Sequence, residues 1–177
     1  DNYNKFFEFK LATVLRDKEE NFIPKKTSLN KKNSNIFGSV NNNFSDFFNL
    51  NYKFAINNNF NSVEHNDLGV EFKLNNFNTK FNFLEESGEM GSSNFLENET
   101  NFQFDEQNFL TFKTRRNRKL NLTEYYDLVY EYKNDCLSAG IKYKKTYYED
   151  RELKPSENLF FTISLIPLTN YEQKIER

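Results

Sequence analysis

Few residues of this chain belong to the types that perform covalent chemistry. Cys136 is the only cysteine and His65 the only histidine. A hydrolase needs a nucleophile with a base beside it, and His65 is expected in a loop. A single histidine is also poor evidence for a metal site, since such sites combine several ligands. We therefore expect no enzyme activity, no metal centre and no cofactor.

The charged residues point to binding rather than catalysis. The densest basic cluster is "KTRRNRK" at 113–119. Guanidinium groups suit phosphate geometry, so this cluster is either a phosphate contact or a solvated loop balanced by nearby acids. The candidate contacts are Arg115, Arg116, Arg118 and Lys119. The chain has 24 basic and 26 acidic residues, and this balance gives no drive toward nucleic acid.

The apolar content is aromatic. The 177 residues include 21 Phe and 10 Tyr but no Trp, and Asn is abundant. Aromatic residues favour strands, whereas Asn favours turns and left-handed backbone conformations. The composition predicts an all-β chain with many turns, and an Asn-rich disordered chain is the competing interpretation.

Apolar and polar residues alternate with period 2 along nearly the whole sequence, which is typical of strands with one apolar and one wet face. In 48–56, for example, Phe48, Leu50 and Tyr52 share one side. The clear strands lie at 48–56, 67–75, 124–133, 136–145 and 159–165, and weaker ones at 6–16, 35–41, 77–85, 94–104 and 108–116. About ten antiparallel strands are predicted.

The connections between these strands alternate in length. Short ones are expected at 41–46, 75–76, 105–107 and 133–135, and longer ones at 17–35, 57–66, 86–94, 116–124 and 149–157. Outer-membrane barrels combine short periplasmic turns with longer extracellular loops, so we favour a transmembrane β-barrel over a soluble β-sandwich. No run of about 18 apolar residues is present, as a transmembrane helix would require.

In a barrel, the polar sides of the strands face a watery interior. The residues expected to line this lumen are Lys53, Lys73, Asp127, Glu131, Lys142 and Lys144. They either line a path for an anionic saccharide or are simply polar side chains solvated by the water inside the barrel. If the strand at 159–168 ends in the periplasm, Cys136 lies at the periplasmic mouth. A lone cysteine is otherwise a small buried residue or a free thiol.

The segment from Thr114 to Leu168 resembles the C-terminal part of the barrel of LptD, the lipopolysaccharide-assembly outer-membrane protein family. The pieces that carry the resemblance are "YEYKNDC" (130–136), the glycine-containing strand after it, "DRELKPSE" (150–157) and "LFFTISLIPL" (159–168). Further upstream, "TSLNKKNSNIFGS" and "FNFLEESGEMG" also resemble strands and loops of that family. The likeness is strongest from 114 to 168.

The resemblance implies a large barrel of roughly 26 strands in the outer membrane of a Gram-negative bacterium. Its partners would be lipopolysaccharide, an LptE-like plug lipoprotein, an LptA-like periplasmic bridge, the barrel-assembly machinery and outer-membrane lipids. The basic cluster would contact lipopolysaccharide phosphates. The last strand would form one side of a lateral gate for lipid, and its gate residues would be Leu159, Phe160, Phe161, Thr162, Ile163, Ser164 and Leu165.

The resemblance also implies a disulfide from Cys136 to a periplasmic domain that this chain does not contain, in an oxidising compartment. We expect residues 1–168 to be the C-terminal portion of such a barrel, in a chain that continues upstream, and residues 169–177 to be a short periplasmic tail. The rival interpretations are another outer-membrane barrel, such as a porin or solute channel, and a soluble β-rich binding module.

Overall fold

The computed structural model describes residues 7–147, 155–165 and 169–176, and these form eleven strands. Two short 3-10 helices, η1 (Lys25–Thr27) and η2 (Gly88–Met90), lie in connections. The strands are β1 (Phe7–Ala12), β2 (Ile36–Ser45), β3 (Phe48–Ile56), β4 (Val63–Leu74), β5 (Phe77–Glu86), β6 (Asn94–Gln103), β7 (Asn108–Asn117), β8 (Leu122–Lys133), β9 (Leu137–Thr146), β10 (Ser156–Leu165) and β11 (Thr169–Glu176).

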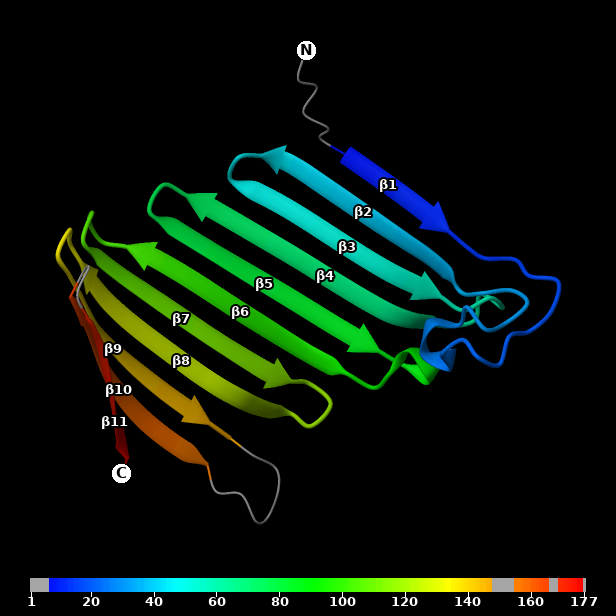
Figure 1. Cartoon of the computed structure of the whole chain (residues 1–177). Helices are drawn as coiled ribbons and strands as arrows, with labels where there is room; N and C mark the ends of the chain where they lie inside the picture. Colours follow the sequence, from blue (N-terminus) through cyan, green and yellow to red (C-terminus); the bar gives the residue numbers. More distant parts are fainter. Residues whose placement is uncertain (1–6, 148–154, 166–168, 177) are drawn as a thin grey trace. The chain divides into compact units, whose positions relative to one another are not determined.

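The strands form one antiparallel sheet in chain order, from β1 to β11 (Figure 1). Each strand from β2 to β10 is hydrogen-bonded to the strand before it and the strand after it, as in a continuous meander. This confirms the prediction of an all-β antiparallel fold. The ten strands expected from period-2 alternation correspond to β1–β10.

The eleventh strand is a correction. We expected residues 169–177 to be a short tail, but Thr169–Glu176 forms β11 and pairs with β10 over its whole length. The segment "TNYEQKIE" alternates only weakly, because polar residues dominate it. Backbone pairing to β10 supplies the order that the hydrophobic pattern does not indicate. The strand Leu159–Leu165 therefore has neighbours on both sides, and residues 166–168 lie outside the described residues.

Longer connections alternate with short ones except at 118–121, which is no longer than the turn 104–107. The longer connections are 13–35, 57–62, 87–93 and 147–155, of which 148–154 lie outside the described residues, and the short turns include 46–47, 75–76, 104–107 and 134–136. Several predicted boundaries were wrong, among them the end of the first strand, expected at 16 and found at Ala12, and the start of β4, expected at 67 and found at Val63. Residues 41–45 belong to β2, and the connection expected at 116–124 shrinks to 118–121, because β7 and β8 continue through a bulge at Arg115 and Arg116.

The chain divides into two compact units, residues 1–72 with 81–96, and residues 73–80 with 97–177. In the first unit the strand register produces rows of side chains on alternate faces. One face contains the row Phe9–Val40–Tyr52–Leu68, and the opposite face contains Lys10–Ser39–Lys53–Asp67. We call these sides the apolar face and the charged face.

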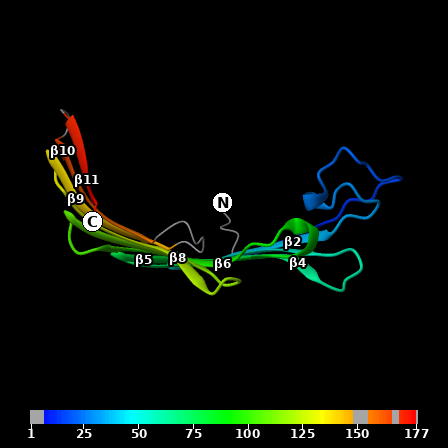
Figure 2. The same ribbon diagram turned by 90° about the horizontal axis from the view of Figure 1, so that it is seen from below.

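The second unit has the same two sides. The row Leu110–Tyr130–Ile141–Phe161 lies on its apolar face, and the row Lys113–Asp127–Lys144–Asn158 on its charged face. The predicted assignment of polar and apolar sides is thus reproduced by the register. Within this unit the strands form a single layer (Figure 2).

The sheet lacks a conventional hydrophobic core. Among the described residues Ala55 is the only hydrophobic residue that is buried. Soluble domains bury the apolar face of a sheet against a second layer, and no such layer covers these strands in the part of the chain that the structure describes. The described strands also form an open sheet, with β1 and β11 at its edges, so the predicted barrel closure is not seen. None of the described segments is a helix able to span a membrane.

Candidate functional site

The apolar face of each unit is exposed. In the second unit Leu128, Ile141 and Ile163 are 41%, 44% and 49% exposed, and in the first unit Phe9 and Leu11 exceed half. Soluble monomers rarely expose contiguous apolar patches larger than a few hundred Å². Large apolar side chains in register across several strands therefore mark a surface that contacts something other than water.

Aromatic and cationic side chains gather where this face of the second unit meets the longer connections. The ring of Tyr126 lies 6.3 Å from Phe112 and 6.2 Å from Tyr147, and the ammonium of Lys145 lies 5.4 Å from the centre of the Tyr147 ring. Tyr143 donates a hydrogen bond to Glu157 at 2.6 Å. Amphipathic rings at the end of an apolar band are typical of the interface between hydrocarbon and headgroups.

The charged face of the second unit is a ladder whose sign changes from strand to strand. β6 and β8 contribute acids, and β7 and β9 contribute bases. The ion pairs are Glu97–Arg115 at 3.5 Å, Glu99–Lys113 at 3.1 Å, Arg115–Glu124 at 2.8 Å and Asp127–Lys142 at 3.7 Å. Opposite charges on adjacent strands stabilise their pairing, so this face largely neutralises itself.

The predicted basic cluster is divided between different environments. Arg115 lies in β7 on the charged face, between two glutamates, and Lys113 is paired with Glu99. Lys113 and Arg115 are therefore balanced by nearby acids, which is the second of the two alternatives that the sequence left open. Arg116 is exposed and donates to Asn121, and Arg118 and Lys119 are exposed in the connection 118–121.

The predicted lumen residues of β3, β8 and β9 lie on the charged face. Asp127 and Lys142 are paired, Glu131 accepts a hydrogen bond from Ser138 at 2.8 Å, and Lys144 lies opposite Asp127. Lys53 belongs to the corresponding row of the first unit. Lys73 lies near the end of β4.

The sequence reasoning did not single out the partners of these residues, Glu97, Glu99 and Glu124. A signal was present, because Glu97 and Glu99 are two residues apart on one strand and Lys113 and Arg115 are two apart on the next. Pairs of like charge with period 2 on consecutive strands predict a cross-strand ladder.

Cys136 is exposed and lies in the short turn 134–136 between β8 and β9. The turn is shaped by Asn134, whose side-chain oxygen accepts hydrogen bonds from the backbone N–H of Cys136 at 3.0 Å and of Leu137 at 2.8 Å. The thiol therefore faces solvent at the end of the sheet that carries the short turns. The chain has no second cysteine with which it could pair.

Another short turn, 104–107, is held in the same way. The carboxylate of Asp105 accepts backbone N–H bonds from Gln107 and Asn108, each at 2.9 Å. The hydrogen bond from the backbone of Gln107, followed by those from Asn108, lowers the pKa of Asp105. Tight turns of this kind fix the register of the hairpins.

His65 lies in β4, not in the loop where we expected it, because β4 already begins at Val63. Its Nδ1 is 3.6 Å from a carboxylate oxygen of Glu86. Among the described residues no group of three or more histidines, cysteines or carboxylates could hold a metal ion.

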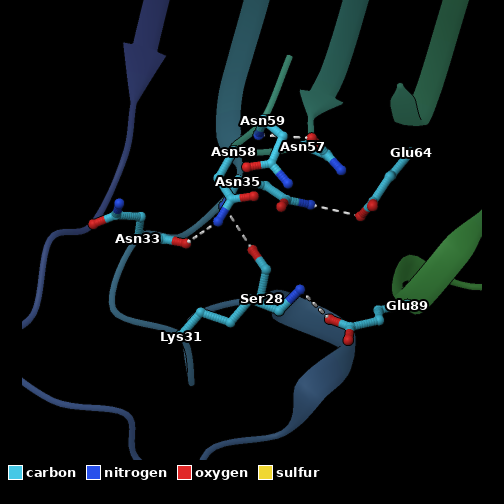
Figure 3. Close-up of polar contacts among 9 residues, drawn as sticks. All are labelled: Ser28, Lys31, Asn33, Asn35, Asn57, Asn58, Asn59, Glu64 and Glu89. Atoms are coloured by element: carbon cyan, nitrogen blue, oxygen red, sulfur yellow. Dashed lines mark hydrogen bonds and ion pairs between the residues drawn. The ribbon is translucent and has the colours of Figure 1, made fainter. Parts of the chain in front are cut away.

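The longer connections of the first unit are joined by a polar network (Figure 3). The buried Asn35 donates from its side chain to Glu64 at 2.7 Å, and its backbone N–H donates to the Ser28 hydroxyl at 2.9 Å. Lys31 pairs with Glu89 at 2.8 Å. Asn58 donates to the carbonyl of Asn33 at 3.1 Å. The network ties 13–35 to 57–62 and 87–93, so these connections form one ordered assembly.

The predicted gate residues Leu159–Leu165 all lie in β10 and alternate between the two faces. Phe161 and Ile163 belong to the apolar face, and Phe160 and Thr162 to the charged face. No family model matches the chain, and no curated protein matches it.

Proposed function

We propose that this chain forms part of the wall of a transmembrane β-barrel in the outer membrane of a Gram-negative bacterium. The observation that carries the proposal is the two-sided sheet, with an exposed apolar face and a charged face, in a chain whose only buried hydrophobic residue among those described is Ala55. Lipid hydrocarbon covers the first face and water the second.

A soluble β-sandwich is the main alternative, and the exposure of the apolar face disfavours it. A sandwich brings two apolar faces together to make a core about 10 Å thick. In this chain the corresponding side chains, such as Ile141 and Ile163, remain nearly half exposed. The energy of that exposure in water, about 25 cal/mol per Å² of apolar surface, disappears when lipid covers the face.

An open sheet in a bilayer needs further strands. Unpaired backbone groups at an edge cost several kcal/mol each in hydrocarbon, so in a bilayer β1 and β11 each need a further strand as a partner. A barrel larger than eleven strands meets this requirement, and the resemblance of 114–168 to LptD supplies one of the right size.

On that resemblance we propose that the barrel assembles lipopolysaccharide into the outer leaflet. An LptE-like lipoprotein would occupy the lumen against the charged face, and an LptA-like bridge would deliver lipid to a periplasmic domain. Cys136 lies at the end of the sheet with the short turns, where a disulfide to that domain would attach. Because β11 follows β10, β11 rather than Leu159–Leu165 is the edge that would part at a lateral gate.

The membrane proposal is tested by fractionating cells that express the full-length protein and washing the membranes with alkaline carbonate. We expect the protein to stay with the outer membrane, to require detergent for extraction, and to migrate differently on gels with and without heating. Extraction into buffer without detergent would overturn the proposal and favour a soluble β-rich module.

A second experiment separates lipopolysaccharide assembly from a porin or solute channel. Depletion of the full-length protein should reduce newly made lipopolysaccharide at the cell surface, and non-reducing peptide mapping should find Cys136 in a disulfide. Unchanged surface lipopolysaccharide together with a free Cys136 thiol would favour a channel, in which the charges of the lumen set selectivity.

A further inference from the structure

A cavity of about 360 Å³ opens in the first unit, between four strands and η2. Its walls come from β1, β2, β3 and β4, with Met90 of η2 beside them. Residues that line it include Lys10, Ala12, Phe37, Lys53, His65 and Met90. The five of these that lie on strands belong to two rows of the charged face, Ala12–Phe37–Ala55–His65 and Lys10–Ser39–Lys53–Asp67. Three further lining residues, Leu11, Gly38 and Phe54, form the row between them, which belongs to the apolar face.

The apolar part of the cavity departs from the pattern of its surroundings. Most residues of the charged face are polar, but Phe37 is aromatic and Ala55 is apolar and completely buried. The polar network of the longer connections fixes the segment that carries Met90, since Lys31 pairs with Glu89 at 2.8 Å and Ser87 donates its backbone N–H to Glu64 at 2.8 Å. The apolar hollow is therefore built by ordered elements.

The charged side chains that line the cavity are all basic. Lys10 is paired with Glu8 at 3.0 Å, and Glu8 also accepts a hydrogen bond from Asn41 at 3.1 Å. Lys53 lies opposite Asp67 in the register, and no ion pair joins Lys53 to any of the described residues. His65 lies 3.6 Å from Glu86. Lys53 is therefore available to a ligand, and the Lys10 ammonium, whose side chain is 65% exposed, has N–H donors besides the one that faces Glu8.

We propose that this cavity binds a small single-chain amphipathic anion, with its acyl chain on Phe37 and Met90 and its anionic head at Lys53 and Lys10. Pockets for small molecules hold roughly 300–1,000 Å³, so the cavity is large enough for one chain and too small for a lipid with several. The head is a carboxylate or a phosphate, and both accept charge-assisted hydrogen bonds from ammonium groups. The proposal does not rest on the membrane assignment, because the strand residues that would hold the ligand, Phe37, Lys53 and Lys10, lie on the charged face.

The test is photo-crosslinking of the purified full-length chain in a non-ionic detergent, followed by peptide mapping. Three probes share one short acyl chain that carries a diazirine, and they end in a carboxylate, a phosphate or a neutral primary amide. We expect at least one anionic probe to label the peptide that contains Met90 about tenfold more than the amide does, as the loss of a charged hydrogen-bond partner requires. The anion that labels more strongly identifies the head group.

Lys53→Gln should reduce this labelling about tenfold, and Lys10→Gln provides a second variant if the first folds poorly. Lys144→Gln, on the charged face of the second unit, is the matched control and should leave it unchanged. Labelling of the apolar face, for instance at Phe161, should be the same for every variant. Equal labelling of the Met90 peptide by the amide, or undiminished labelling in Lys53→Gln, would overturn the proposal. A chain that proved soluble would still give the labelling expected here.

Discussion

Adjacent residues of this chain have opposite environments, and this decides what each can do. Arg115 and Arg116 are neighbours in a basic run, yet Arg115 lies between Glu97 and Glu124 while Arg116 is exposed. Period-2 alternation predicts that they point to different sides. The sequence alone could not say which acids reach Arg115, because the register shifts by a bulge between these two arginines.

The two arginines allow a matched pair of substitutions. Arg115→Gln removes two ion pairs and leaves Glu97 and Glu124 near each other without the base between them, so it should lower the free energy of unfolding by about 1 kcal/mol. Arg116→Gln should change it by less than about 0.5 kcal/mol. Urea titrations of both variants at low salt would measure the difference. Equal losses would mean that the ladder contributes nothing specific to stability.

At the scale of the strands, period-2 alternation located β3 and β9 to within one residue at each end. It located β5, β6 and β7 equally closely, although their alternation is weaker. It missed β11, whose composition is mostly polar and whose order comes from pairing with β10. It also placed His65 in a loop, since a bulge between β3 and β4 interrupts the alternation there. Pairing and bulges are properties of two strands, so a reading of one segment cannot supply them.

The pairing of β11 with β10 can be tested by cysteine cross-linking. Thr162 lies opposite Glu172 in the register, and directly opposite residues have Cα atoms about 4.5–5.5 Å apart, which a disulfide can bridge. In a Cys136→Ser background, Thr162→Cys with Glu172→Cys should therefore oxidise to a disulfide under mild conditions. Mass spectrometry after thiol blocking would detect it.

The control moves the second cysteine by one residue. Gln173 follows Glu172 and points to the other side of the strand, so Thr162→Cys with Gln173→Cys should keep both thiols free. If both pairs formed disulfides equally, residues 169–176 would behave as a loose tail and not as a strand in fixed register.

At the scale of the molecule, the sequence predicted the two faces but not the assembly of the longer connections or the cavity beside it. Asn35 and Glu64 are far apart in the chain, and nothing local indicates that one donates to the other. The abundance of Asn, taken from the sequence as a sign of turns, also serves this network, because an amide side chain donates and accepts at once. Contacts between separate connections depend on which strand ends meet, and so they follow the topology.

Whether lipid covers the apolar face can be tested by placing an arginine at each of two neighbouring positions. Ile141 lies on the apolar face and Lys142 on the charged face, one residue further along β9. In a bilayer, Ile141→Arg should cost about 2–4 kcal/mol if the residue lies near the midplane, since the guanidinium must enter hydrocarbon. In a soluble module the same change should cost less than about 0.5 kcal/mol, because Ile141 would already be exposed to water. Lys142→Arg, and Leu120→Arg in the connection 118–121, should be nearly neutral in both cases. Unfolding titrations of the full-length protein reconstituted in lipid vesicles measure the three costs, and a neutral Ile141→Arg would exclude the midplane of the hydrocarbon as the surroundings of Ile141.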